Sequence, residues 1–110
     1  MTNSILSFQP TFIQLPEHIE YPKAGVLSKV LLQSKVCQYT LFCLAADTEI
    51  SEHTSTRNAV VQGLEGKGIL TLEGKDIALE PGVFVVRPAN APHALRAIDN
   101  LAFLLTLSQP

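Results

Sequence analysis

Charged residues are scarce in this chain. Of its 110 residues only 16% are Asp, Glu, Lys or Arg, below the ~25% typical of soluble domains. Eight basic residues against ten acidic ones give a formal net charge of −2, and no segment is rich in lysine or arginine. The chain therefore lacks the basic surface that nucleic acid binding requires, and we expect no nucleic acid partner.

Long apolar segments are missing as well, although 46% of the residues are hydrophobic. The longest uncharged apolar stretches, 39–46 and 101–107, are too short to cross a bilayer, which needs about 20 residues. The N-terminus has neither a positive region nor a long apolar run, so no signal peptide is expected. We therefore expect a cytoplasmic protein with no membrane partner.

Only two cysteines are present, Cys37 and Cys43. In a strand their even spacing places both on one face, about 20 Å apart along the chain at ~3.3 Å per residue. They cannot form a disulfide with each other, and the spacing does not fit a two-cysteine metal knuckle. We expect two buried thiols.

Several catalytic signatures are also absent. The sequence has no Ser-His-Asp order, no glycine-rich phosphate loop and no local pair of carboxylates of the glycosidase type. Of the three histidines, His18 is expected at the surface, with a role as an additional metal ligand as the alternative. His53 and His93 remain as candidates for a functional site.

The sequence does contain a series of short β-rich runs separated by turn residues, the best of which is Gly74 between Leu72 and Ile77. Strands are predicted at 26–33, 36–45, 58–64, 68–72, 76–79, 83–87, 93–97 and 101–107. We predict an all-β, antiparallel barrel or sandwich over residues 25–110. Residues 1–24, with three prolines, are expected to form an extended arm that adds one strand near 11–14.

Several of these strands are apolar on both faces, most clearly residues 101–105. An antiparallel sheet with one wet face would alternate instead. The second face must be covered by the N-terminal arm or by another copy of the chain. We expect a symmetric homodimer.

The segment around His53 resembles the first motif of the cupin family. That motif reads glycine, five residues, His-x-His, three or four residues, glutamate, six residues, glycine. Gly66 fits the closing glycine, and counting back from it places the first histidine at His53. Asp47 stands at the opening glycine, a position that an aspartate in a turn can satisfy.

The segment around His93 resembles the second cupin motif, which reads glycine, five residues, Pro-x-Gly, two residues, histidine. Gly82, Pro88 and His93 fit it at full spacing, with Asn90 in place of the second glycine. Asparagine tolerates a left-handed backbone, so the turn is expected to survive. The resemblance implies a double-stranded β-helix, the jelly-roll barrel of the cupins.

The first motif departs from the family at two metal-ligand positions. Full cupin sites hold a divalent metal with three imidazoles and one carboxylate. Here Ser55 stands at the second histidine, and Ala59, or Val60 with the longer spacing, stands at the glutamate. With only His53 and His93 as ligands, we expect no metal or a weakly bound divalent ion such as Fe, Mn, Ni or Zn.

These residues predict an apolar pocket flanked by His53, Ser55 and His93. The leading hypothesis is a small-molecule-binding or accessory module with a degenerate metal site. Its rivals are a metal-dependent dioxygenase or isomerase acting on a small molecule and a structural protein whose pocket is filled by side chains. Arg57 is expected to be a solvated loop residue, with carboxylate binding as the alternative, and Arg87 to pair with Glu49 or Glu52.

Overall fold

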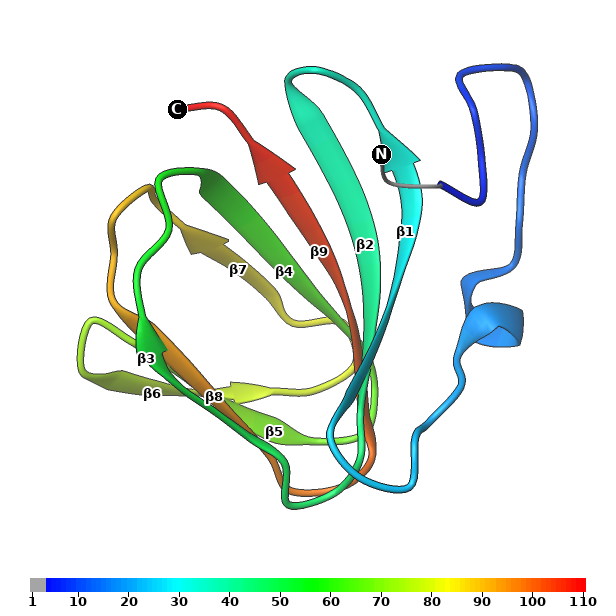
Figure 1. Ribbon diagram of the computed structural model, residues 1–110. Coiled ribbons are helices and arrows are strands. Elements are labelled where there is room, and N and C mark those ends of the chain that lie inside the picture. Colours follow the sequence, from blue (N-terminus) through cyan, green and yellow to red (C-terminus); the bar gives the residue numbers. More distant parts are fainter. Residues whose placement is uncertain (1–3) are drawn as a thin grey trace.

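The computed structural model describes residues 4–110, and within that range it contains nine strands in two antiparallel sheets that face each other (Figure 1). The first sheet has the order β1-β2-β9-β4-β7 and the second the order β3-β8-β5-β6. The strands are β1 (Val26–Gln33), β2 (Cys37–Leu44), β3 (Glu49–His53), β4 (Asn58–Glu65), β5 (Gly68–Leu72), β6 (Lys75–Leu79), β7 (Phe84–Arg87), β8 (His93–Ala97) and β9 (Leu101–Ser108). The predicted antiparallel jelly-roll barrel is confirmed.

The strand that sequence reasoning missed is β3, because Ile50 is its one residue that is not exposed and no apolar alternation marks it. The predicted strand at 11–14 is wrong. Those residues run without regular structure into a short 3₁₀ helix, η1 (Leu15–His18). Within residues 4–110 no helix has the length and apolar character needed to span a bilayer.

The turns at the family's glycine positions keep the backbone that those positions need. Asp47 and Asn90 both have φ near +70°, in the left-handed region, as their places in the two motifs predict. Gly66 has φ +77°, and a Cβ on it would collide with the carbonyl of Asn100. The tight turn at Gly74 is also present, with φ +80°.

The inner core lies between the two sheets and draws on both of them. Alternate residues of β2 and β9, among them Leu44 and Phe103, point toward the barrel interior. The buried members of this inner core are Leu44, Val61, Leu70, Leu79, Val85, Leu95, Ala97, Leu101 and Phe103. These side chains form the floor and walls of the site described below.

The outer face of the first sheet is covered by the N-terminal segment, which explains why β2 and β9 are apolar on both faces (Figure 1). Ile13, Leu15, Ile19 and Tyr21 pack over the buried residues Leu31, Leu41, Cys43 and Ala102. The Tyr21 hydroxyl donates a 2.6 Å hydrogen bond to Glu65 Oε1, and burial together with Glu65 raises the pKa of Tyr21. Cys43 is buried and Cys37 half-buried, both as free thiols.

Candidate functional site

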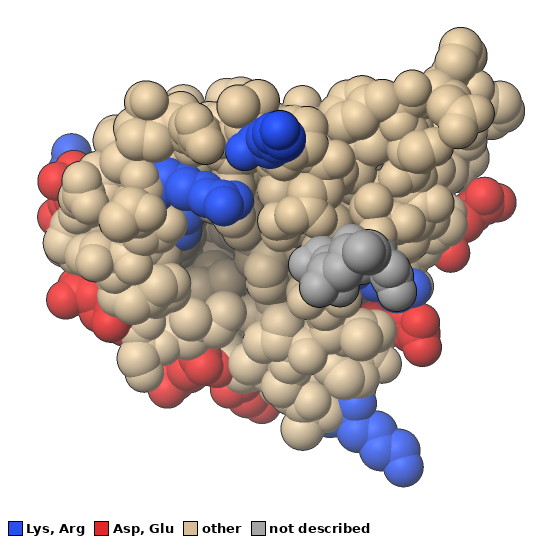
Figure 2. Space-filling view, turned by 45° about the horizontal axis from the view of Figure 1, so that its top comes forward, with Lys and Arg blue, Asp and Glu red and all other residues tan. Residues whose placement is uncertain are grey.

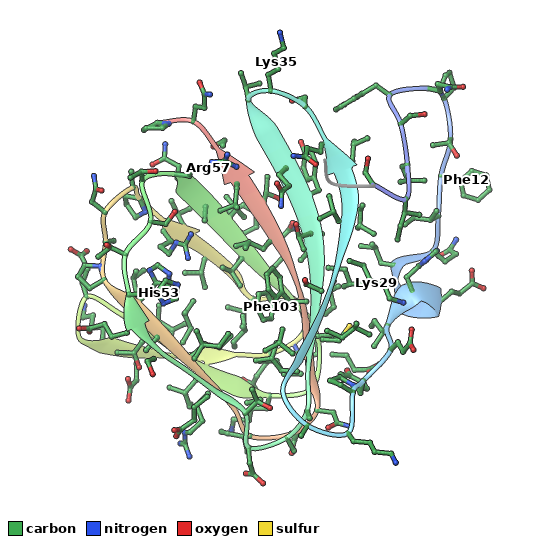
Figure 3. All side chains as sticks on the ribbon, in the orientation of Figure 1. Phe12, Lys29, Lys35, His53, Arg57 and Phe103 are labelled. Atoms are coloured by element: carbon green, nitrogen blue, oxygen red, sulfur yellow. The ribbon has the colours of Figure 1, made fainter. Side chains whose placement is uncertain are left out.

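A cavity of about 260 Å³ lies inside the barrel and opens to solvent on the side seen in Figure 2. Its walls are mostly apolar, and three basic side chains, His53, Arg87 and His93, are the polar groups among its lining residues. Figure 3 shows His53 and Phe103 on the inner side of the barrel wall. The apolar lining residues are Phe42, Ile50, Val61, Leu70, Ala94, Leu95, Phe103 and Leu105.

His93 begins β8 and is 4% exposed. Its Nδ1 lies 2.9 Å from the carbonyl oxygen of Ala91, so Nδ1 carries the hydrogen and the Nε2 lone pair faces the cavity. Burial lowers the pKa of His93, the bond to Ala91 opposes that shift, and the charge of Arg87 adds to it. The ring is therefore a neutral hydrogen-bond acceptor at physiological pH.

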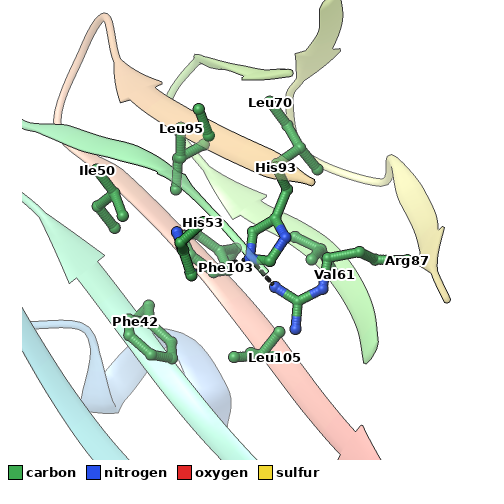
Figure 4. A pocket seen from close by; sticks show the side chains of 11 residues that line it. Phe42, Ile50, His53, Val61, Leu70, Arg87, His93, Leu95, Phe103 and Leu105 are labelled. Atoms are coloured by element: carbon green, nitrogen blue, oxygen red, sulfur yellow. Dashed lines mark hydrogen bonds between the residues drawn. The ribbon is translucent and has the colours of Figure 1, made fainter. Parts of the chain in front are cut away.

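His53 ends β3 at the rim of the cavity, directly opposite His93 in the β3–β8 pairing. The Nε2 atoms of the two rings lie 2.9 Å apart, with ring centroids at 4.1 Å. His53 Nδ1 also faces a backbone carbonyl, that of Ser51, at 2.9 Å. The structure therefore brings together the two histidines that the sequence motifs select, with both Nε2 atoms directed inward (Figure 4).

Arg87 ends β7 and extends into the barrel, where it is 7% exposed. Its Nη1 donates a 2.6 Å hydrogen bond to His93 Nε2 (Figure 4). The predicted pairing with Glu49 or Glu52 is wrong, because within residues 4–110 the one ion pair joins Lys29 to Glu20. Desolvation lowers the pKa of Arg87, but a guanidinium keeps its charge in proteins.

Strand register explains why Arg87 has room in the barrel. In the β4–β7 ladder Ala59 lies directly opposite Arg87, and both residues are buried. Directly opposed side chains on one face lie about 5 Å apart. The family's glutamate position is thus reduced to a methyl group, and the neighbouring arginine occupies the interior.

A resident divalent metal does not fit these side chains. The convergent Nε2 atoms and the Nδ1 contacts to backbone carbonyls are what metal-binding histidines show. However, His93 Nε2 has one lone pair, and the Arg87 guanidinium already uses it. Within residues 4–110 no group of three His, Cys, Asp or Glu side chains could complete a coordination sphere.

Ser55 does not line the cavity. The strand β3 ends at His53, and the chain then turns, so Ser55 lies in the connection to β4. Its hydroxyl accepts a hydrogen bond from Arg57 N, and its carbonyl accepts one from Asn90 N at 2.7 Å. Ser55 therefore joins the two loops beside the histidines.

The two remaining polar candidates lie away from the cavity lining. Arg57 is exposed above the barrel (Figure 3), as expected. His18 belongs to η1 on the outer side, where its carbonyl accepts a hydrogen bond from Lys29 Nζ.

Residues 40–107 match a family model described as "Cupin domain". A conserved protein of unknown function from Streptococcus pyogenes is 29% identical, with a TM-score of 0.85 over 98% of this chain and 93% of that one. A cupin superfamily protein from Desulfitobacterium hafniense is 26% identical, with a TM-score of 0.84 over 93% of this chain and 94% of that one. A predicted oxalate decarboxylase from Thermotoga maritima shares the fold at 19% identity, with a TM-score of 0.71 over 77% of this chain and 81% of that one. No curated protein matches the chain.

Proposed function

Because this chain belongs to the cupin family and its barrel encloses a cavity, we propose that it is a small-molecule-binding module that works without a resident metal ion. The observation that carries the proposal is the 2.6 Å bond from Arg87 Nη1 to His93 Nε2. That bond places a fixed organic cation on the lone pair that a metal would need. The apolar cavity is left available to a ligand.

Two measurements test the proposal. Metal content is determined on untagged protein purified without chelators, and the expected result is well below one ion per chain. Iron, manganese, nickel or zinc near one per chain in the wild type, lost in His53→Ala and His93→Ala, would contradict it. A thermal-shift screen of small acids, amides and sugars on metal-free protein should find at least one stabilising compound.

The alternative function is a metal-dependent cupin enzyme, a dioxygenase or isomerase acting on a small molecule. It is favoured by the two convergent Nε2 atoms, 2.9 Å apart, which are already oriented by backbone carbonyls. Under this hypothesis, a divalent ion binds weakly only because Arg87 occupies the lone pair of His93 Nε2. The double variant Ala59→Glu/Arg87→Met separates the two functions, because it frees the lone pair and adds a carboxylate.

The double variant should bind Zn²⁺ or Ni²⁺ at least about tenfold more tightly than the wild type, measured by calorimetry. The matched control is Ala59→Gln/Arg87→Met, which has the same volume but no carboxylate. If the wild type binds as tightly as the double variant, Arg87 does not block the metal and the enzyme reading gains support.

We also propose that the protein is a cytoplasmic homodimer, as the free thiols and the uncovered apolar surface favour. Phe84 and Val86 on the outward side of β7 are each 60% exposed, beyond the area that the N-terminal segment covers. A second copy would remove them from water. Sedimentation at micromolar concentration should give a dimer mass that Phe84→Ser/Val86→Ser halves. The control is Phe12→Ser, since Phe12 lies in the N-terminal segment and is 84% exposed, and it should leave the mass unchanged. A monomeric wild type would refute the dimer.

A further inference from the structure

The charge of Arg87 has no counterion in the part of the chain that the structure describes. The side chain is 7% exposed, its one hydrogen bond goes to the neutral His93 ring, and no carboxylate lies within ion-pair distance. A guanidinium has five N–H donors, so most of them have no protein acceptor. Proteins rarely bury a charge without pairing it, because the lost hydration must be replaced.

The remaining donors of Arg87 are not sealed off from solvent. Within residues 4–110 every fully buried side-chain nitrogen or oxygen has a hydrogen-bond partner. The Arg87 nitrogens that lack a partner are therefore in contact with solvent, and Arg87 lines the cavity. The other polar lining residues are His53 and His93, so every titratable side chain on the cavity wall is basic.

Resting on the proposed small-molecule function, we propose that the ligand is a small apolar carboxylate and that Arg87 binds its carboxylate group. A planar carboxylate accepts two parallel hydrogen bonds from one guanidinium, which is the strongest pairing available to Arg87. The ligand would supply inside the barrel the negative charge that the chain itself does not.

The remaining lining residues indicate that the rest of the ligand is apolar. Phe42 and Phe103 lie on the wall with their rings nearly parallel, at 4°, and their centroids 5.2 Å apart. Val61, Leu70 and Leu105 complete an apolar surface. A sugar would need polar partners around its whole perimeter, whereas the polar side chains here lie together at one end.

The cavity volume limits the size of the apolar part of the ligand. A cavity of roughly 150 Å³ is enough to hold benzene. The volume here is about 260 Å³, which accommodates one ring or a branched aliphatic group together with a carboxylate. A benzoate-sized monocarboxylate therefore fits both the charge and the shape.

The test compares each acid with its neutral isostere. Benzoate and benzamide, phenylacetate and phenylacetamide, and isobutyrate and isobutyramide are titrated into the whole protein at neutral pH and followed by ¹H–¹⁵N NMR. At least one acid should bind about tenfold or more tightly than its amide. Arg87→Met should remove that preference, and Arg87→Lys should keep part of it.

Two further variants make the assignment specific. Arg96→Met is the matched control, since it removes one arginine from the exposed side of β8 and should leave the preference unchanged. Ala59→Glu places a carboxylate opposite Arg87, where it should compete with the ligand and weaken acid binding as Arg87→Met does. Ala59→Gln, of equal volume, should weaken acid binding less.

Each remaining outcome has a distinct meaning. Equal binding of acids and amides to the wild type would overturn the carboxylate inference and leave small-molecule binding intact. An acid preference that survives Arg87→Met would overturn the role of Arg87. Absence of binding by every acid and every amide would overturn the inference and the proposed function together.

Discussion

Lys29 and Arg87 are both largely withdrawn from water, one on each side of the same sheet, and their surroundings differ. The Lys29 side chain, 24% exposed, contacts Glu20 Oε1 at 3.1 Å and donates to the His18 carbonyl at 2.9 Å. Arg87 is more deeply buried and contacts a neutral imidazole. The chain therefore pairs its outer cation with its own residues and leaves the inner one without a negative partner among residues 4–110, and this difference is the basis of the proposal that a ligand carboxylate binds Arg87.

The largest expected change in the free energy of unfolding comes from the outer face, where the substitution removes only packing contacts. Leu41 is fully buried beneath the N-terminal segment. Leu41→Ala should lower the free energy of unfolding by roughly 2–5 kcal/mol, measured by urea denaturation. The half-exposed Ile98 provides the control, because Ile98→Ala should change that energy by less than about 0.5 kcal/mol. A small effect of Leu41→Ala would mean that the segment does not pack there in solution.

The two cations should respond with opposite signs when each is replaced by methionine. Arg87→Met removes an unpaired buried charge and should raise the free energy of unfolding by about 1–2 kcal/mol. Lys29→Met removes a paired and partly solvated charge and should lower it by about 0.5 kcal/mol. The measurement is urea denaturation of both variants in the absence of ligand. Destabilisation by Arg87→Met would show that the guanidinium is satisfied within the protein.

The bond from Tyr21 to Glu65 should contribute a smaller amount to the outer face. Tyr21→Phe deletes the 2.6 Å hydrogen bond while keeping the packed ring, so a loss of about 1 kcal/mol is expected. Because the bond lies outside the barrel, acid binding by the cavity should not change. Glu65→Gln, which keeps an acceptor, is the control and should cost less.

The smallest expected effect is a pH dependence of the free energy of unfolding, caused by His93 on the inner face. In the folded protein, burial and the nearby Arg87 lower the pKa of His93. In the unfolded chain the pKa of this side chain is about 6.5. As the pH falls, His93 is protonated in the unfolded chain at a higher pH than in the folded protein. Its contribution to the free energy of unfolding is therefore complete above the unfolded pKa and decreases as the pH drops from about 7 to 5. Denaturation midpoints of wild type and His93→Gln should diverge at neutral pH and converge toward pH 5. Parallel curves would place the His93 pKa at its ordinary value.

The fold was predictable to a large extent because turns and alternation are local properties. Strands β1, β5 and β8 have the predicted bounds, and the turn residues Asp47 and Asn90 adopt the left-handed backbone expected of them. Sequence alternation failed for β3, where polar residues face solvent on a strand paired on one side. Period alone does not mark such a strand.

The site residues that follow from motif spacing could be predicted from the sequence. Those whose position depends on how two strands pair could not. Spacing selected His53 and His93, which the structure places in contact. It also selected Ser55, but the strand ends before that residue. Arg87 was expected to pair with Glu49 or Glu52 rather than to line the cavity, because β7 is apolar on both sides and its sequence does not say which residues point inward. Its position opposite Ala59 is a property of two paired strands.

The N-terminal segment has one more consequence, for the strand that borders it. β1 is the edge of its sheet, and the amides of Ile5 and Leu6 donate to the carbonyls of Val30 and Leu31 at 3.0 and 2.8 Å. An open edge strand offers its backbone groups to any other extended chain, which leads to aggregation. Two hydrogen bonds from the same polypeptide occupy these groups, so the N-terminal segment covers part of an edge that another extended chain could otherwise pair with.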